Sequence, residues 1–377
     1  MKNIHHICNN YISSKVHENL ILEISKNHDL FQTVFVPVRT TSDIGKNYFS
    51  SENVDIFYFN YFFRFLKFFP MLKILIISVY YFIKLRKNIT DFIICHNLWS
   101  DGMVAFFIHF FKKTPYLLVV RNTDMNVFLP KLIHYRWLIK LMVKKSEGLV
   151  FVNNVYKENF EKLYPDIFSC AKKIKVIPNG VDQFWLQNYL TQNCENIKTD
   201  SLVYVGAFNE NKNIKGIFEA IQILRKNNRN FDMYFVGGDE NQFKKLLGLV
   251  EIPEYIKVIG KIKDKAKLLE IYRKSKIFIM PSFFETFGLV YVEALLQGCA
   301  VIYSKGQGID GMIVSDLVCS VDPYNTNEIS QKIEYLLNNF EILSVNSNLI
   351  ENLINDYNWN YVSNEYLSYI KGVEGNY

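Results

Sequence analysis

Two glutamates eight residues apart flank the most informative segment of the chain, which reads IFIMPSFFETFGLVYVEALLQG. Glu285 precedes the turn Thr286–Leu289, and Glu293 lies about one and a half turns into the helix expected over residues 287–297. The first N–H groups of a helix have no intrahelical partner and carry the positive end of its dipole, so they bind phosphate. Gly288 lets an anion approach closely. The spacing therefore predicts a diphosphate between two carboxylates, one reaching a sugar and the other a ribose.

Each glutamate also has an ordinary explanation. Glu285 could cap the helix, and Glu293 could be a solvated residue on its surface. Their joint occurrence within P-S-x-x-E-T-F-G and E-A-x-x-x-G favours the binding-site interpretation. Gly298 has the position of the glycine that ends a helix, and a new strand is expected directly after it.

The elements that must position this segment are short β-branched runs that alternate with helical stretches. Continuous apolar runs are typical of buried parallel strands, and their alternation with helices predicts an α/β fold of doubly wound sheets. The expected strands are Ile4–Cys8, Thr33–Pro37, Phe92–Cys95, Tyr116–Arg121, Gly148–Val152, Lys175–Ile177, Ser201–Val205, Asp232–Val236, Ile256–Ile259, Ile277–Met280 and Ala300–Tyr303.

The strand series breaks near residues 183–200, where the chain is polar and rich in asparagine. A chain of 377 residues also exceeds the usual size of one domain. We therefore predict two Rossmann-like domains, residues 1–183 and 184–355. Ligands of open α/β sheets bind at the carboxyl ends of the strands, so a cleft is expected that both sheets face.

The composition is that of a globular protein, with 49% apolar and 21% charged residues, which excludes disordered and collagen-like chains. A net charge of +6 is too weak for a dedicated nucleic-acid binder. The six cysteines lie far apart without C-x-x-C spacing, which argues against zinc and redox motifs. The start MKNIHHICNN lacks the apolar region of a signal peptide, and a reduced cytoplasmic setting is expected.

The charge is distributed unevenly along the chain. Residues 1–185 carry 24 basic and 14 acidic side chains, whereas residues 186–377 carry 19 and 23. Residues 61–83 are apolar and aromatic, but their uncharged part, 74–83, is about half of the roughly 20 residues that a membrane span needs. We expect a basic helix lying on the anionic inner face of the cytoplasmic membrane. The alternatives are solvated lysines on helix faces and a buried helix with lysines at its rim.

The segment P-S-F-F-E-T-F-G-L-V-Y-V-E-A-L-L-Q-G resembles the Glu-x7-Glu signature of retaining GT-B-fold glycosyltransferases of glycosyltransferase family 4. The resemblance covers most of the chain and is strongest over residues 174–320. It implies that Glu285 lies beside the donor sugar as a catalytic residue and that Glu293 holds the ribose. The amides of Phe287, Gly288 and Leu289, next to Thr286, would hold the diphosphate.

Two further segments resemble the donor domain of this family. V-Y-V-G-A-F-N-E-N-K places Gly206 in the turn and Lys212 at the position of a lysine that neutralises the leaving diphosphate. Ala207 replaces the arginine usual there, which Lys215 could compensate, and Lys212 could also be a surface lysine. V-I-G-K-I resembles the segment that receives the base, which implies a pocket formed by Gly260, Lys261 and Ile262.

The first domain departs further from the family pattern. Its first loop, N-N-Y-I-S-S-K, has no glycine, and the residues expected to face the cleft are Asn10, Ser14 and Lys15. C-H-N-L-W-S-D-G follows a strand and supplies His96 as a third catalytic candidate and Asp101 as an acceptor or sugar contact. V-V-R-N-T-D follows the next strand and supplies Arg121 and Asp124. The alternatives are a structural histidine and an internal Arg–Asp ion pair. Y-N-W-N-Y-V-S-N-E-Y resembles a final helix, within residues 356–377, that crosses back to the first domain.

The resemblance implies a retaining hexosyltransferase that uses a nucleotide sugar, with UDP expected as the nucleotide and GDP as the alternative. No cofactor is expected, and no metal, because the chain has no D-x-D motif. The expected acceptor is a surface glycan of lipopolysaccharide, O-antigen or capsule type on a lipid carrier, and nucleic acid is not expected as a partner. The rival interpretations are a GT-B-fold nucleotide-sugar epimerase and a catalytically silent sugar-nucleotide binder.

Overall fold

The computed structural model describes residues 1–61, 69–85, 89–190, 198–343 and 347–372. Contacts within the chain divide it into two compact units. The first contains Met1–Val152, Tyr156–Gly180 and the C-terminal helix α15 (Trp359–Gly372), and the second contains Val181–Asn358 with Asn153–Val155.

The first unit is built on a seven-stranded parallel sheet in the order β3-β2-β1-β4-β5-β6-β7. The order reverses between β1 and β4, which are neighbours in space although two strands separate them in sequence. The strands are β1 (Lys2–Ile7), β2 (Leu30–Val38), β3 (Val54–Asn60), β4 (Phe92–Cys95), β5 (Tyr116–Val120), β6 (Gly148–Phe151) and β7 (Ile174–Val176).

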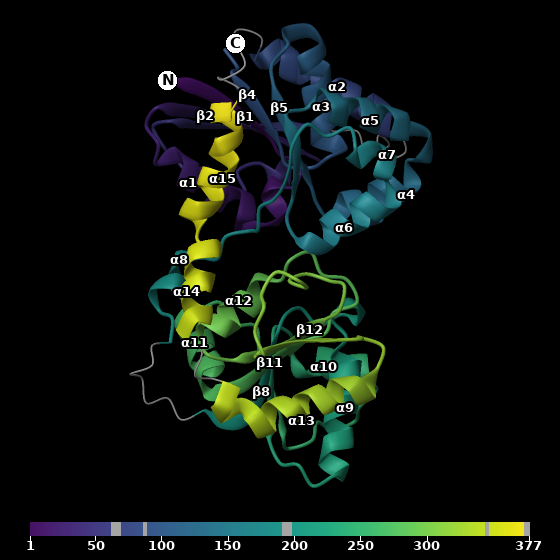
Figure 1. Ribbon diagram of the computed structural model, residues 1–377, viewed down its shortest axis with the longest axis vertical. Helices are drawn as coiled ribbons and strands as arrows, with labels where there is room; N and C mark the ends of the chain where they lie inside the picture. The colour runs from purple at the N-terminus through teal and green to yellow at the C-terminus, as the bar shows by residue number, and fades with distance from the viewer. Residues whose placement is uncertain (62–68, 86–88, 191–197, 344–346, 373–377) are drawn as a thin grey trace. The chain divides into compact units, whose positions relative to one another are not determined.

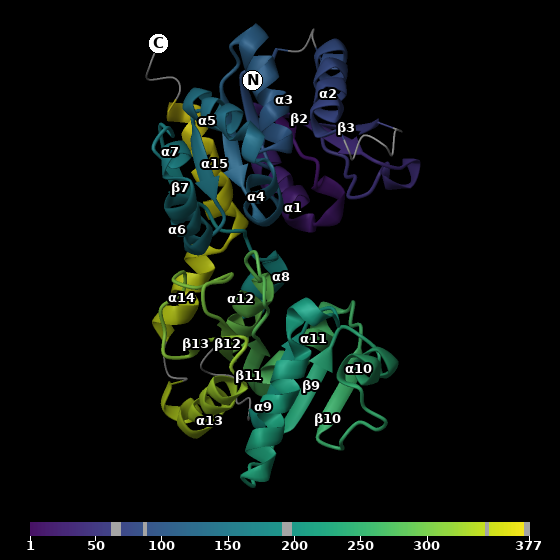
Figure 2. The same ribbon diagram turned by 90° about the vertical axis from the view of Figure 1, so that its right-hand side faces the viewer.

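Helices cover both faces of this sheet. Right-handed crossovers place α1 on one face and α2, α3 and α5 on the other. The contacts agree, since α1 packs with α15, α2 with α3, and α3 with α5 (Figures 1 and 2). The helices are α1 (Lys15–Ser25), α2 (Pro70–Leu85), α3 (Ser100–Lys112), α4 (Leu129–Lys131), α5 (Arg136–Lys145), α6 (Asn154–Leu163) and α7 (Pro165–Phe168), with short turns η1 (Tyr11–Ser13), η2 (Thr41–Asp43), η4 (Asp124–Phe128) and η5 (Ile133–Tyr135).

The second unit holds a six-stranded parallel sheet in the order β10-β9-β8-β11-β12-β13. Here the order reverses between β8 and β11. The strands are β8 (Thr199–Val205), β9 (Asp232–Val236), β10 (Ile256–Gly260), β11 (Ser275–Met280), β12 (Ala300–Ser304) and β13 (Val318–Val321). The helices are α8 (Gln183–Gln187), α9 (Ile214–Lys226), α10 (Glu240–Leu247), α11 (Lys265–Lys274), α12 (Leu289–Leu296), α13 (Thr326–Leu343) and α14 (Ser347–Asp356), with the turn η6 (Glu210–Lys212) (Figure 2).

The prediction of two parallel doubly wound sheets is confirmed. Each of the expected strands is present, with ends that differ by a few residues at most. Two strands were not predicted, β3 and β13, and both are edge strands. Their side chains are mostly half-buried, so they lack the continuous apolar run that marks a central strand.

The helix after β11 begins later than predicted. We expected it over residues 287–297, but α12 starts at Leu289 because Gly288 has a φ of 77°. That left-handed conformation cannot belong to a right-handed helix. Gly298 follows the helix with a φ of 75°, as expected of the glycine that ends it.

The apolar stretch at residues 61–83 lies only partly within the described residues, because 62–68 fall outside them. Its second part forms α2, which buries Ile74, Ile77 and Tyr81 in the first unit. Among the helices of the described ranges, none combines the length and hydropathy that a membrane crossing requires.

Candidate active site

The predicted donor residues of the second unit meet where the order of its sheet reverses. Lys212 follows β8 and Glu285 follows β11, and these two strands are neighbours. The Lys212 Nζ atom lies 2.5 Å from Glu285 Oε2, and the two side chains are 20% and 14% exposed. Such reversal points are where ligands of open α/β sheets bind. A cation and a carboxylate 73 residues apart in sequence are thus held together at the carboxyl ends of the strands.

Hydrogen bonds between loops fix Glu285 in place. The side-chain amide of Asn211 donates to the carbonyl of Phe284 and accepts from its N–H, at 2.9 and 3.0 Å. The N–H of Glu285 donates to the Gln307 side chain at 3.1 Å, and the N–H of Gly308 donates to the Glu285 carbonyl at 3.2 Å. Sequence reasoning did not identify Asn211 or Gln307, because their role depends on contacts between separate loops.

The loop that holds Glu285 leads directly into the start of α12. Gly288 occupies the N-cap position, and within the described residues no side chain caps this end of the helix. A Cβ on Gly288 would lie 2.3 Å from the Tyr291 ring, so glycine is required for space as well as for conformation. Thr286 donates its N–H to Glu285 Oε1 at 3.1 Å, and Phe287 turns its side chain into the core. The Tyr291 N–H donates to the Gly288 carbonyl at 2.9 Å, so the amides predicted to hold the diphosphate, at Phe287, Gly288 and Leu289, precede this first bonded amide of the helix.

Glu293 lies on the same helix in an environment that disfavours its charge. Burial and the Asp182 carboxylate raise its pKa to about 7, while Lys265 and a hydrogen bond from Trp185 act in the opposite direction. Asp182 is itself held by Lys265, at 2.5 Å. Glu293, which we expect to bind the ribose, therefore has a carboxyl group that titrates near neutral pH. Asp182, Trp185 and Lys265 were not predicted, since nothing in their spacing links them to Glu293.

The remaining donor-side candidates lie on the loops that follow β8 and β10. Gly206 lies against the backbone of Gly237. A Cβ atom on Gly237 would lie 2.0 Å from the Gly206 carbonyl oxygen, so this close approach requires glycine at position 237. Gly260 has a φ of 81° and ends β10, and Lys261 and Ile262 follow it. Lys215, which could replace the cation lost at Ala207, instead approaches Glu219 on α9 at 3.9 Å and is 72% exposed.

His96 lies buried in the first unit, not at an exposed strand end. It belongs to a chain of side chains that runs from Gln32 through His6 and His96 to His17. Gln32 donates to the Ile21 carbonyl, so its oxygen faces His6 and can only accept. Each ring then donates toward Gln32, so that His6 accepts from His96 and His96 accepts from His17, with N···N distances of 3.1 and 3.2 Å. Burial lowers the pKa of each histidine, which keeps all three rings neutral.

Two of these histidines and a nearby cysteine could together hold a metal ion. Ligand atoms of Cys8, His17 and His96 lie within 4.8 Å of one another, and all three residues are buried. Sequence reasoning missed this juxtaposition, because the three residues come from different elements of the fold.

Asp101 is buried behind the first loop. It accepts hydrogen bonds from Asn9, Asn97 and Ser100, and burial raises its pKa to about 7. Asn10 reaches the Asn97 side chain at 3.4 Å, which joins the loops after β1 and β4. Lys15 lies away from this group, exposed at the start of α1 near Glu18.

Asp124 binds backbone amides in the interior of the first unit. Its carboxylate accepts from the N–H groups of Leu98, Trp99 and Arg121 at 3.0 to 3.1 Å, so it ties the loop after β4 to the loop after β5. Burial raises its pKa to about 6 in spite of these bonds and of the nearby Arg121 guanidinium. Arg121 Nε donates to the His96 carbonyl at 3.0 Å. Asp124 therefore shapes the loops, and Arg121 holds the backbone of His96.

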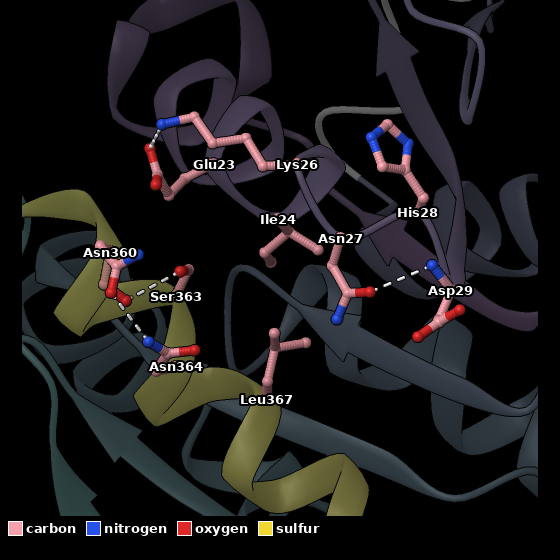
Figure 3. A pocket seen from close by; sticks show the side chains of 10 residues that line it. All are labelled: Glu23, Ile24, Lys26, Asn27, His28, Asp29, Asn360, Ser363, Asn364 and Leu367. Atoms are coloured by element: carbon pink, nitrogen blue, oxygen red, sulfur yellow. Dashed lines mark hydrogen bonds and ion pairs between the residues drawn. The ribbon is translucent and has the colours of Figure 1, made fainter.

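A polar pocket of about 490 Å³ lies between α1 and α15 (Figure 3). Its lining includes Asn27, His28 and Asp29 at the start of β2, together with Asn360 and Asn364 of α15. This is the amino edge of a parallel sheet, whereas the candidate site residues follow the carboxyl ends of their strands. The pocket is therefore separate from them.

Residues 191–354 match the family model of glycosyl transferases group 1. An uncharacterized glycosyltransferase of Methanocaldococcus jannaschii is 25% identical over 69% of this chain and 70% of that protein. The capsular polysaccharide biosynthesis glycosyltransferase CapH of Staphylococcus aureus is 28% identical over 59% of this chain and 62% of that protein. The alpha-monoglucosyldiacylglycerol synthase of Acholeplasma laidlawii is 24% identical over 61% and 62%. The chain thus spans about two thirds of each of these relatives.

Solved structures agree on the fold. The sucrose-phosphate synthase of Thermosynechococcus elongatus matches 100% of this chain and 100% of its own with a TM-score of 0.73 at 16% identity. HepE of Anabaena, in complex with UDP and glucose, matches 98% of this chain and 100% of its own with a TM-score of 0.66 at 14% identity. The second unit is thus similar to glycosyl transferases group 1, and the structural neighbours show that the chain has the GT-B fold.

Proposed function

We propose that this protein is a retaining, metal-independent glycosyltransferase that moves a hexose from a nucleotide sugar, with UDP as the nucleotide, to a lipid-linked surface glycan at the cytoplasmic membrane. The observation that carries the proposal is the Lys212–Glu285 pair at the reversal point of the second sheet, beside the uncapped start of α12. The names of the capsular and glycolipid relatives favour this class of acceptor.

Each residue of this site has a role that its chemistry fits. Lys212 and the first amides of α12 would bind the diphosphate and stabilise the charge that develops as it leaves. Glu285 would turn from Lys212 toward the donor sugar, and Glu293 would accept hydrogen bonds from the ribose hydroxyls. In the transfer step, the acceptor oxygen bonds to the anomeric carbon while the bond from that carbon to the phosphate oxygen breaks. The departing phosphate takes the acceptor proton, so no protein base is needed on that face.

A thermal-shift screen of nucleotide sugars identifies the donor, because a bound ligand stabilises the folded protein by mass action. With that donor, Glu285→Gln should abolish transfer and leave nucleotide binding nearly unchanged. Lys212→Ala should lower turnover at least about 100-fold, since one electrostatic contact in the transition state is worth about 2.7–4 kcal/mol. Lys215→Ala is the matched control, because that lysine is exposed and lies near Glu219.

The two rival functions give different results. An epimerase would convert the donor alone, with no acceptor, into a second nucleotide sugar. A silent binder would show nucleotide-dependent stabilisation but no transfer to any glycan or glycolipid acceptor. Unchanged turnover in Glu285→Gln or Lys212→Ala would refute the site assignment itself.

A further inference from the structure

The outer face of α2 and α3 is apolar where a surface helix is normally polar. On α2, Leu72, Leu75, Val79 and Ile83 are 44%, 47%, 48% and 61% exposed, although the opposite stripe of the helix is buried. A helix that is apolar on both faces has a partner on each of them. The sheet covers one face, and nothing within the described residues covers the other.

The neighbouring helix α3 extends this surface. The helices α2 and α3 lie side by side (Figure 2). Phe110 and Phe111 at the end of α3 are 64% and 68% exposed, and the Phe111 and Phe82 rings lie 6.0 Å apart across the two helices. Contiguous apolar patches of this kind mark interaction sites, whereas single exposed apolar residues do not. We call the surface formed by Leu72, Leu75, Val79, Phe82, Ile83, Phe110 and Phe111 the α2–α3 face.

A groove of about 330 Å³ runs along this face between the two helices. Leu75, Val79 and Phe82 line one side, and Phe107 and Phe111 line the other. Among the described residues that line it, Ser78 is the one with a polar side chain, and its hydroxyl donates to the Ile74 carbonyl at 2.8 Å. The side chains that line the groove are thus apolar except for one hydroxyl whose proton is already used, which fits an acyl or polyprenyl chain.

The exposed charges around the face have one sign. The two helices and Lys113 carry Lys73, Lys84, Lys112 and Lys113, and their one acidic residue, Asp101, is buried at the opposite end of α3 from the two phenylalanines. Lys112 Nζ lies 5.7 Å from the Phe82 ring centroid and Lys113 Nζ lies 5.8 Å from that of Phe110, so the ammonium groups border the aromatic patch. An apolar surface edged by lysines is complementary to a membrane with anionic headgroups.

We infer that the α2–α3 face docks on an anionic lipid bilayer, with a lipid chain in the groove and phosphate headgroups on the lysines. This inference rests on the proposed function, since it places the enzyme where a lipid-linked acceptor resides. The sequence predicted a basic helix on the membrane surface, with a buried helix as the alternative. Under this inference α2 has both properties, because it buries one apolar stripe in the first unit and exposes the other to the membrane.

Flotation of the full chain with vesicles of phosphatidylcholine and phosphatidylglycerol tests this inference. The unaltered protein should float with the anionic vesicles and detach as salt is raised. The double variant Leu75→Glu and Phe111→Glu should lower the partition coefficient at least tenfold. Exchanging Lys84, Lys112 and Lys113 for Gln should lower it about a hundredfold and remove the salt dependence, at roughly fivefold for each lysine near the surface.

The matched control is Val250→Glu, an 88% exposed valine of the second unit, which should float like the unaltered protein. Circular dichroism and thermal unfolding verify that each variant is folded. The inference is overturned if the folded protein does not float, if Val250→Glu weakens flotation as much as the face variants, or if sedimentation without lipid shows a dimer that the face variants dissociate. Flotation requires no sugar donor. Flotation without transfer would therefore refute the proposed function alone, and transfer without flotation would refute the docking face alone.

Discussion

The titration of Glu293 makes a quantitative prediction about donor binding. Its pKa is raised from 4.5 to about 7 by burial first and by Asp182 second, so close to half of the molecules carry it protonated at neutral pH. The carboxylate accepts a hydrogen bond from each ribose hydroxyl through its two oxygens, and these charge-assisted bonds are roughly twice as strong as those to the neutral acid. Affinity should therefore rise with pH up to about 7 and level off above it. If the carboxylate alone binds, the affinity is about thirtyfold weaker at about pH 5.5 than at about pH 8.5.

Isothermal titration calorimetry with a nucleotide sugar measures this dependence. The donor should be a nucleotide diphosphate sugar, since its phosphates do not titrate in this range. At neutral pH, binding should release close to half a proton, which is visible as a dependence of the binding enthalpy on the buffer. Glu293→Gln should bind more weakly than the unaltered protein at pH 8.5, with an affinity that barely changes with pH. A flat profile in the unaltered protein, or a slope that persists in Glu293→Gln, would refute the reasoning.

The same group predicts an opposite effect on stability. A carboxyl group with a raised pKa in the folded state favours folding below its unfolded pKa, and this contribution is lost as pH rises through about 7. Glu293→Gln should therefore stabilise the ligand-free protein at about pH 8.5, by up to about 3 kcal/mol, and change little at about pH 4.5. Urea unfolding at both pH values measures it. A variant that is less stable at the higher pH would show that the carboxylate has a stabilising partner there.

Three further outcomes are expected. Gly288→Ala should cost about 1–3 kcal/mol in urea unfolding, because φ is positive there and the new Cβ meets the Tyr291 ring; an unchanged midpoint would contradict the turn geometry. Gln32→Leu should cost about 1–3 kcal/mol, because the His6 N–H loses its acceptor in the core, and a cost below about 0.5 kcal/mol would contradict the direction of the histidine chain. EDTA should leave turnover unchanged in a coupled transfer assay, whereas inhibition that added Mg²⁺ or Mn²⁺ reverses would end the metal-independent assignment.

The central part of each sheet could be predicted from the sequence because buried parallel strands are continuous apolar runs. The segment around Glu285 was equally informative, since its glycine and flanking acids are close together in sequence. The edge strands β3 and β13 were missed for the converse reason, because partly exposed strands carry mixed side chains. The later start of α12 follows from the φ of Gly288, which the apolar pattern of the helix does not encode.

Contacts between side chains on neighbouring strands could not be predicted, because they depend on how the strands pair in the sheet. His6 on β1 reaches Gln32 on β2 and His96 beyond β4 because β1 pairs with both of these strands. A sequence pattern shows that His96 follows a strand, but burial depends on what packs over the strand end. His17 of α1 packs there, and His96 therefore became an interior residue.

The side chains at the reversal points of the two sheets differ in chemistry, and under the proposed function this difference predicts which unit binds the donor and which the acceptor. In the second unit, the loops after β8 and β11 bring together the charged pair Lys212 and Glu285, next to the start of α12, which no side chain of the described residues caps. In the first unit, the loops after β1 and β4 meet through the amides Asn10 and Asn97, over the buried Asp101. A diphosphate needs cations and free N–H donors, which the second unit supplies within the segment that matches the family model. Neutral amides are suited to the hydroxyl groups of a sugar acceptor, so substitutions at Asn10 and Asn97 should change acceptor choice and leave donor affinity unchanged.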